Sequence, residues 1–436
     1  MSNSEGMLRK PDPESSSKVS TTCPFFSVLI PTMNRPRLLG AAIRTAMWQT
    51  FEDFELIVSD NSNDEECRKK NWAAIEKYAD DPRVHYIRPD SWMNLPDHWE
   101  FASRHASGRY VVMLADRRVM RPSALAYLHS EIGAFPKQNK VLAWDSSCRF
   151  DERSGILANR PFTGAAEVLD SKKLASEYAT FADWRSSCMS WNRLPRMLNG
   201  CYRFDVAREI REEHGRLFLP VSPDYISAFL ALAYTDNFVY LDRPLFISHG
   251  SESTGQMGVV HGIEDYASTV RSVDSFEGLP MGLITVSSTI VRDLLTVKDL
   301  VGERFSGVCV DWVGYYTFNY HEIMLKERSG SPMDISALYA QLWDDVGRLT
   351  PEQQGRVKQR VKKLDRERAS LIALRRLVVR LELDPLYHSV MGKIRHVRQR
   401  IAGKPLYTDV FDAALQTDHI LTDAVERANG SGEASK

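Results

Sequence analysis

Short apolar runs alternate with helix-like spacings of apolar residues in the first third of the chain. An apolar run at 27–30 is followed by a helical pattern at 38–47, and a second apolar run occupies 54–58. Strands that alternate with helices favour a doubly wound, mostly parallel α/β sheet. The full pattern predicts strands at 27–30, 54–58, 84–87, 110–114 and 141–144, and helices at 38–47, 65–78, 95–107 and from 122.

The pattern changes after about residue 140. Helices are predicted near 170–181, 206–214 and 225–234, with a strand at 238–241, a loop from 247 and mainly helical sequence beyond 260. This change predicts four parts: a disordered leader at 1–23, an α/β half at 24–145, a second half of the same α/β domain at 146–258, and a mainly helical C-terminal region at 259–436.

Composition narrows the class of protein. The 436 residues carry a formal net charge of −1, so the molecule as a whole has no electrostatic preference for nucleic acid or membranes. The six cysteines form no CxxC pair, which argues against a zinc ribbon or a disulfide framework and favours a cytoplasmic setting. No apolar run reaches the ~18 residues of a membrane span, and the N-terminus does not resemble a secretory signal.

Two polar loops, at 31–36 and 59–64, follow the first two predicted strands. Ligands of parallel sheets bind where the strands end at their carboxyl edge. Both loops carry amide, hydroxyl, carboxylate or guanidinium groups, which are suited to a nucleotide. The two loops are therefore the first candidates for a binding site.

The segment 26–128 resembles the family 2 glycosyltransferases of the GT-A fold. The motifs that carry the resemblance are PTMNRPRLL, VSDNSND, NLPDHWEFASRHASGRY and LADRR, in that order, and the later SPDY and DRPLFISHGSESTG resemble the acceptor half of the family. The resemblance covers roughly residues 25–255. It implies a GT-A-like fold, a nucleotide-sugar donor of the UDP or GDP type, and inverting transfer of the sugar to a hydroxyl of a glycan or lipid-linked acceptor, in surface polysaccharide synthesis among other pathways.

The resemblance also implies which residues hold the donor. An Asp in the second loop of the family contacts the nucleotide base, and Asp60 occupies that place; the alternative is that Asp60 only makes a turn or caps the next helix. Arg104 is expected to reach the base or a phosphate, or else to lie on a solvated helix face. The complete set of expected donor contacts is Pro31, Thr32, Asn34, Arg35, Asp60, Asn94, Arg104 and Asp116.

The sequence departs from the family at Asp116-Arg117-Arg118. The family usually carries two or three acidic residues here, which hold a divalent cation on the diphosphate. Only Asp116 remains as a candidate ligand for Mn²⁺ or Mg²⁺. Three readings stay open: Arg117 or Arg118 neutralises the leaving diphosphate directly, the donor site has lost turnover, or both arginines face solvent or surface acids.

Two further residues complete the expected site. Asp224, in Ser222-Pro223-Asp224-Tyr225, matches the context of the family's catalytic base, and its alternative is an ordinary residue in the first turn of a helix. His249 lies near a loop that closes over the donor in the resembling enzymes, so it is expected at the diphosphate. A lone histidine is more often structural.

The segment 351–405 is basic, with 15 Lys and Arg against 5 Asp and Glu. One reading is an amphipathic helix at an anionic membrane surface, which would place the protein peripherally at the inner membrane. The other is a helical hairpin packed on the rest of the protein. No interleaved aromatic residues accompany the basic ones, which disfavours nucleic-acid binding.

The leading hypothesis is therefore an inverting glycosyltransferase that uses Arg in place of acidic metal ligands. The alternative is a nucleotide-sugar-binding homologue without catalysis, acting as the partner of another transferase. A nucleotide-dependent oxidoreductase is disfavoured, because no Gly-rich phosphate fingerprint follows the first strand.

Overall fold

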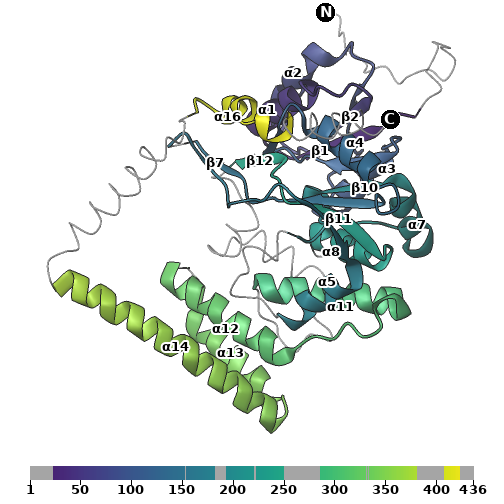
Figure 1. Ribbon diagram of the computed structural model, residues 1–436. Coiled ribbons are helices and arrows are strands. Elements are labelled where there is room, and N and C mark those ends of the chain that lie inside the picture. Colours follow the sequence, from purple (N-terminus) through teal and green to yellow (C-terminus); the bar gives the residue numbers. More distant parts are fainter. Residues whose placement is uncertain are drawn as a thin grey trace, which may run out of the picture.

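A computed structural model gives the fold (Figure 1). Residues 1–22 of the predicted leader lie outside the described residues, and so do the residues 250–255 that follow His249. The structure describes residues 23–152, 154–181, 193–219, 222–249, 285–329, 331, 333–380 and 407–422.

An eight-stranded mixed sheet forms the centre of the α/β part, in the order β3-β2-β1-β4-β10-β6-β11-β9. Its first four strands are parallel, and β10 and β9 run antiparallel to their neighbours. The mostly parallel α/β fold predicted from the sequence is confirmed. The strands are β1 (Phe26–Thr32), β2 (Phe54–Asp60), β3 (Val84–Ile87), β4 (Tyr110–Met113), β6 (Val141–Trp144), β9 (Ala166–Asp170), β10 (Gly200–Arg203) and β11 (Asn237–Leu241).

Helices cover both faces of this sheet, because alternate residues of each buried strand point to opposite sides. Val28 and Ile30 of β1 pack on one side with α1, α2 and α4, whereas Leu29 packs on the other with α3, α5, α7, α8 and α11. Trp99 belongs to the second core, as expected of a large aromatic residue. The helices are α1 (Pro36–Met47), α2 (Glu65–Ile75), α3 (Leu95–Arg104), α4 (Ala124–Ala134), α5 (Ser171–Thr180), α7 (Phe204–His214), α8 (Pro223–Ala233) and α11 (Val286–Val301).

A smaller four-stranded sheet, in the order β5-β12-β7-β8, lies beside the large one. The sequence analysis missed β5 and predicted a loop from 247. That prediction was wrong, because β12 pairs with β5 and β7 through 249. The strands are β5 (Arg118–Met120), β7 (Arg149–Asp151), β8 (Ile156–Ala158) and β12 (Phe246–His249).

The C-terminal region is helical, with α12 (Trp312–Ser329), α13 (Ile335–Gly347) and α14 (Pro351–Arg380). Val357, Val361 and Leu364 of α14 pack with α12 and α13, so the apolar residues in this part of the basic segment are covered by protein. A last helix, α16 (Val410–Gln416), lies back on the α/β part near α1 (Figure 1).

Among the described helices, none combines the length and the apolar character needed to cross a bilayer. The eight-stranded sheet includes strands from both sides of residue 145, and residue 258 lies outside the described ranges. The four-part division of the chain therefore stays a prediction.

Candidate active site

The register of the parallel strands brings three candidate residues to one edge of the large sheet. Thr32 pairs with Asp60 at the ends of β1 and β2. Leu29 pairs with Met113, so the chain beyond β4 reaches Asp116 beside Thr32. The Thr32 hydroxyl donates to Asp116 Oδ2 at 2.9 Å. Pro31, one residue before Thr32, is a buried part of β1.

Asp60 is fully buried, and both of its carboxylate oxygens accept hydrogen bonds from the protein. The Ser62 amide donates to one oxygen at 2.9 Å, and the Tyr86 hydroxyl donates to the other at 2.7 Å. Burial and the adjacent carboxylate raise the pKa of Tyr86. Asp64, rather than Asp60, caps the following helix. Asp60 therefore makes the turn contact that was its alternative role in the sequence analysis. It lies at the edge of the sheet where the donor is expected.

Reciprocal hydrogen bonds fix the loops around Asp60. Asn61 donates to the Met93 carbonyl at 2.7 Å and accepts from the Met93 amide at 3.0 Å. Asn94 caps α3 by accepting from the Asp97 amide. Asn34, with φ of 55°, donates through its backbone amide to Ser62 Oγ at 2.8 Å. The three loops after β1, β2 and β3 therefore form one hydrogen-bonded unit.

The turn that contains Asp116 is strained. Ala115 adopts φ of 59°, in the left-handed region that costs an L-residue about 1–2 kcal/mol. Asp116 is buried, and its Oδ1 lies 3.5 Å from Nη1 of Arg35. Burial raises the pKa of the Asp116 carboxyl, and the charges of Arg35 and Arg117 oppose that shift. Strained turns of this kind cluster at functional sites.

Positive charge accumulates beside Asp116. Burial lowers the pKa of the Arg117 guanidinium, and the nearby charges of Arg35 and Arg149 act in the same direction. Burial also lowers the pKa of Arg118, together with the charges of Arg117 and Arg196. The negative charge of Asp224 acts in the opposite direction and raises the pKa of both arginines. The cluster therefore gathers five guanidinium groups, those of Arg35, Arg117, Arg118, Arg149 and Arg196, around the carboxylates of Asp116 and Asp224.

Arg117 differs from the other members of this cluster in its partners. Within the ranges that the structure describes, its side chain makes no hydrogen bond and no ion pair. Arg118, by contrast, donates to the carbonyl of Leu198 and is buried. Arg117 is partly exposed and has no such partner among the described residues, so it is the group in the cluster best suited to bind an anion.

Asp224 lies in the first turn of α8, after Ser222 and Pro223. Its Oδ2 is 3.7 Å from Nη1 of Arg196. The Arg196 side chain is held by Asn199 and Ser146, each at 3.1 Å. Asp224 and Arg117 are thus brought together from positions more than one hundred residues apart in the sequence.

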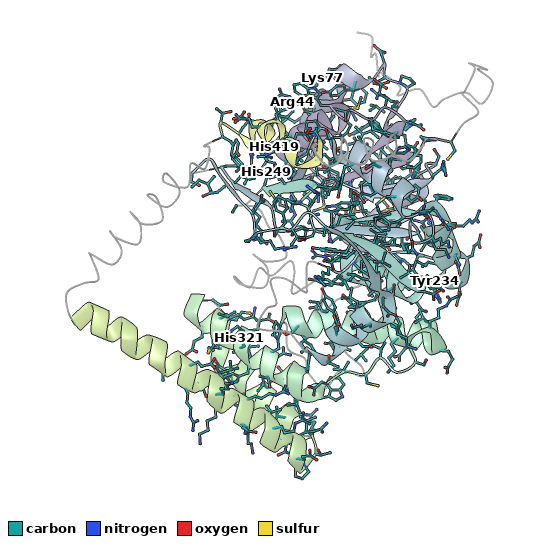
Figure 2. The ribbon with its side chains drawn as sticks, viewed as in Figure 1. Arg44, Lys77, Tyr234, His249, His321 and His419 are labelled. Atoms are coloured by element: carbon teal, nitrogen blue, oxygen red, sulfur yellow. The ribbon has the colours of Figure 1, made fainter. Side chains whose placement is uncertain are left out.

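His249 reaches the same neighbourhood by its backbone, since its amide donates to the Arg117 carbonyl at 3.1 Å. Its ring pairs with Glu152, which also lies 3.4 Å from Arg37 of α1. Strand alternation sets the His249 ring on the opposite face of the small sheet from Ser248 and Arg118. Figure 2 shows His249 in the α/β part, near α16.

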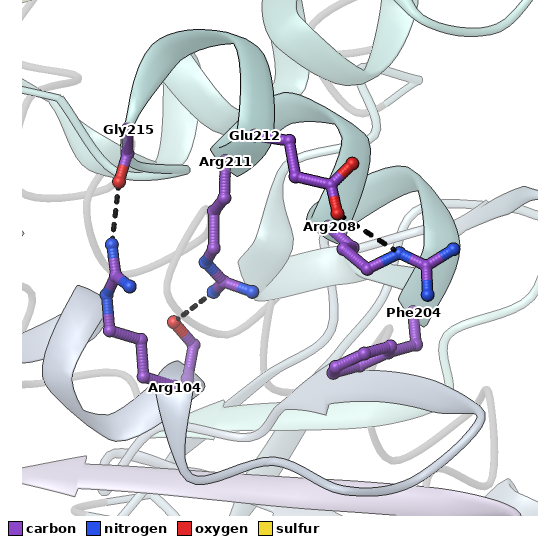
Figure 3. Close-up of a pocket in the computed structure, with 7 residues that line it drawn as sticks. Arg104, Phe204, Arg208, Arg211, Glu212 and Gly215 are labelled. Atoms are coloured by element: carbon purple, nitrogen blue, oxygen red, sulfur yellow. Dashed lines mark hydrogen bonds and ion pairs between the residues drawn. The ribbon is translucent and has the colours of Figure 1, made fainter.

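Arg104 lies elsewhere. It ends α3, whose first residue is at the loops described above, and it donates to the Gly215 carbonyl at 2.6 Å (Figure 3). Its Nε lies 3.0 Å from Glu100. The neighbouring amide of Phe204 bonds to the carbonyl of Arg109, just before β4 begins. Arg104 therefore lines a groove at the amino end of the strands, and the structure does not bring it to the other candidates.

Part of the chain that carries this geometry matches a known protein family. Residues 27–147 match the model described as glycosyl transferase family 2. This part of the chain belongs to that family. The matched range covers the loops after β1 and β2, the strained turn at Ala115 and both Arg117 and Arg118.

Two curated relatives match the family 2 part. A GalNAc(5)-diNAcBac-PP-undecaprenol beta-1,3-glucosyltransferase of Campylobacter jejuni is 31% identical over 106 residues, which are 24% of this chain and 33% of that protein. Protein CgeD of Bacillus subtilis is 24% identical over 169 residues, 37% of this chain and 38% of that protein. The chain thus spans little more than a third of the length of these relatives. A solved structure, S. aureus TarS 1-349 in complex with UDP-GlcNAc, aligns with 74% of this chain and 89% of its own, at 14% identity and a TM-score of 0.43.

The family 2 site does not offer the ligands of a divalent cation. Asp116 is a single carboxylate, it already accepts from Thr32, and its neighbours are guanidinium groups. Across the described ranges no three acidic, His or Cys side chains lie close enough to hold a metal ion. Mg²⁺ and Mn²⁺ prefer several oxygen ligands, so the residues present here do not fit such an ion.

Arg149 and Arg196 belong to this cluster, and the sequence analysis did not find them. Arg149 begins β7, and Arg196 precedes a 3₁₀ turn at Met197–Asn199. Neither carries a local motif, because each is delivered by pairing between distant segments.

Proposed function

We propose that this protein is an inverting glycosyltransferase that moves a sugar from a nucleoside diphosphate sugar to a hydroxyl acceptor without a metal ion. The observation that supports the proposal is the gathering of five guanidinium groups around Asp116 and Asp224 at the carboxyl edge of a family 2 domain. A departing nucleoside diphosphate carries about three negative charges at neutral pH, because the second pKa of a terminal phosphate is near 6. The arginine cluster therefore matches the leaving group in the sign of its charge.

The proposed reaction needs one proton acceptor and one anion site. The Asp224 carboxylate takes the proton of the acceptor hydroxyl while the oxygen attacks the anomeric carbon. The bond from that carbon to the diphosphate oxygen breaks, and its electron pair leaves with the diphosphate. Arg117, with Arg118 and Arg149 behind it, stabilises the charge as it develops.

The ion pair between Arg196 and Asp224 supports the role of Asp224. Arg196 lies 3.7 Å from the Asp224 carboxylate, and the side-chain bonds of Arg196 to Asn199 and Ser146 fix where that partner lies. Asp224 is also partly exposed, with 19% of its side chain accessible, so an acceptor can approach it.

The proposal specifies only the chemical class of the acceptor. One relative is named as acting on an undecaprenol diphosphate-linked glycan, which makes a glycan or lipid-linked hydroxyl the first acceptor to test. The basic residues of 351–405 would then lie near the anionic lipid surface, as the sequence analysis considered. Residues 381–405 are outside the described ranges.

The experiment is donor turnover with and without Asp224. Release of nucleoside diphosphate from UDP-glucose, UDP-GlcNAc and GDP-mannose is measured in EDTA, with water as the acceptor. The proposal expects slow release by the native protein and a decrease of about 10²-fold or more in Asp224→Asn, with an unchanged melting temperature. Equal release by both proteins would remove Asp224 as the base, and binding of these donors without any release would favour the non-catalytic alternative.

A further inference from the structure

The small sheet has two chemically different faces. Ser248 of β12 pairs with Arg118 on one side and with Arg149 on the other, so these three residues share a face. Val119, Phe150 and Ile247 alternate with them and form the opposite, apolar face. One face therefore carries two arginines of the active site, and the other needs to be covered.

The C-terminal segment 407–422 covers the apolar face. Tyr407, Val410, Ala413 and Ala414 pack in one cluster with the apolar residues of the small sheet. Figure 1 shows α16, in yellow, beside α1, and Phe411 of this helix stacks on Trp48 at 4.7 Å with Arg44 above it. The chain thus returns from the helical region to the back of the arginine-bearing sheet.

Arg121, directly after β5, connects this segment to the small sheet and is fully buried. Its Nε donates to Thr417 Oγ1 at 3.1 Å, its Nη1 donates to the Pro244 carbonyl, and its Nη2 lies 3.7 Å from Cys148 Sγ. Pro244 lies just before β12, and Cys148 just before β7. One guanidinium therefore ties together three strands of the small sheet and the C-terminal segment.

A second set of bonds fixes the same junction. Asp418 accepts from the Ser123 amide at 2.9 Å and from the Ser123 hydroxyl at 2.6 Å. Arg243 donates to the Ile420 carbonyl at 2.6 Å. These bonds hold the segment against the chain that leads out of β5 and into β12, only a few residues from Arg118.

We propose that the C-terminal segment 407–422, acting through Arg121, positions the arginines of the small sheet for the diphosphate of the donor. Arg121 is a positioning residue in this role, since it lies behind the site and reaches it only through β5, β7 and β12. The inference rests on the proposed function, because it assigns the segment to the binding of that donor. It gives the helical half of the chain a part in donor binding through a contact far from the nucleotide loops.

The direction of the effect follows from where the contacts lie. The loops that hold the base and ribose are fixed by Asn61 and Asn34, which do not touch the segment. Loosening the junction should therefore weaken the contribution of the diphosphate and leave that of the nucleoside unchanged. Coupling between separate sites is commonly about fivefold or more in affinity.

The test uses variants of the full chain and measures affinity for UDP and for uridine in EDTA. Thr417→Val and Asp418→Ala each remove contacts across the junction. Asp412→Ala is the matched control, because among the described residues that carboxylate accepts side-chain and amide hydrogen bonds from Thr408 and Gln416 of its own segment and from none across the junction. Arg121→Lys keeps the positive charge but cannot make all three contacts of the guanidinium at once. All measurements are made well below each variant's melting temperature.

The expected result is a loss of UDP affinity of about fivefold in Thr417→Val, Asp418→Ala and Arg121→Lys, with uridine affinity unchanged and Asp412→Ala like the native protein. Equal UDP affinity in all folded variants would overturn the role of the segment while leaving the proposed function intact. A parallel loss of uridine affinity would also overturn it, since that indicates general loosening. Failure of the native protein to bind any nucleoside diphosphate would overturn both proposals.

Discussion

Two groups of arginines lie at opposite edges of the large sheet, and they differ in the carboxylates that pair with them. At the amino edge, Arg104, Arg208 and Arg211 line a groove of about 380 Å³ (Figure 3). Glu100 lies 3.0 Å from Arg104 and 2.8 Å from Arg211, and Arg208 is 3.7 Å from Glu212.

At the carboxyl edge, five guanidinium groups face two carboxylates, and the turn before Arg117 contains a residue in the left-handed region. Buried like charges and a strained backbone both oppose folding. The two edges therefore differ in pairing rather than in the presence of arginines. Arg117 makes no hydrogen bond or ion pair among the described residues, whereas each arginine of the groove lies near a glutamate. We therefore propose that the carboxyl edge binds an anion and that the amino edge serves stability.

The largest effect is expected for Arg117→Ala against Arg208→Ala. Removing one preorganised charge at the leaving group commonly costs about 10²–10³ in rate, so donor kcat/KM should fall by that factor in Arg117→Ala. Arg208→Ala should change it less than about twofold, since exposed pairs contribute little. Steady-state turnover of the donor makes the comparison, and equal losses in both variants would erase the distinction between the edges.

At the amino edge, Glu100→Gln should lower the stability of the protein and leave nucleotide binding unchanged. This carboxylate accepts from Arg211 and from the amides of Leu217 and Phe218. Breaking a buried pair of this kind costs about 3 kcal/mol of unfolding free energy. Urea denaturation should show that loss while UDP affinity stays at the native value. An unchanged stability, or a loss of donor binding, would contradict the assignment of this edge.

The pH dependence of stability should reveal a buried histidine close to the nucleotide loops. His98 lies in the first turns of α3, its Nε2 is 2.9 Å from Ser59 Oγ, and burial lowers its pKa to about 4. The folded state thus binds fewer protons than the unfolded state, whose His titrates near 6.5. Stability should therefore rise with pH between about 4 and 6.5, by roughly 2–3 kcal/mol.

His98→Gln should flatten this part of the stability profile, and denaturation at pH 5 and pH 7 measures the change. The matched comparison is His105→Gln at the amino end of the strands, whose ring is exposed and bonds only to the Phe101 carbonyl. An unaltered pH slope in His98→Gln would show that another group produces it.

The smallest effect is expected for Ala115→Gly. Glycine adopts the left-handed region at little steric cost, so the substitution should raise unfolding free energy by at most about 1 kcal/mol. A more mobile turn should hold Arg117 less firmly and slightly weaken donor binding. Thermal denaturation measures the change in stability, and donor titration measures the change in affinity. A loss of stability would mean that the turn is not strained.

The sequence predicted the α/β fold and the edge of the sheet because those signals are local. The strands β1 and β2 are buried apolar runs, and the loops after them carry the family's motifs. Asp224 was predicted in the same way, from a Ser-Pro-Asp helix start. The structure brings Asp224 to Arg117 and Arg118, which the sequence analysis listed separately.

The small sheet could not be predicted from local patterns. Its strands are three or four residues long, and β5 pairs with β12 across more than one hundred residues. An arginine begins β5, so the segment has no apolar run, and the contributions of Arg149 and Arg196 depend on that pairing. Arg104 shows the opposite failure: a motif resemblance placed it at the donor, while α3 carries it to the other end of the strands.

The central claim is that guanidinium groups, rather than a metal ion, take the diphosphate of the donor. Calorimetric titration of the native protein with UDP and GDP, in excess EDTA and again in excess Mn²⁺, tests it most directly. The account predicts that at least one nucleotide binds, with the same affinity in both buffers. Binding that appears only with Mn²⁺ would contradict it.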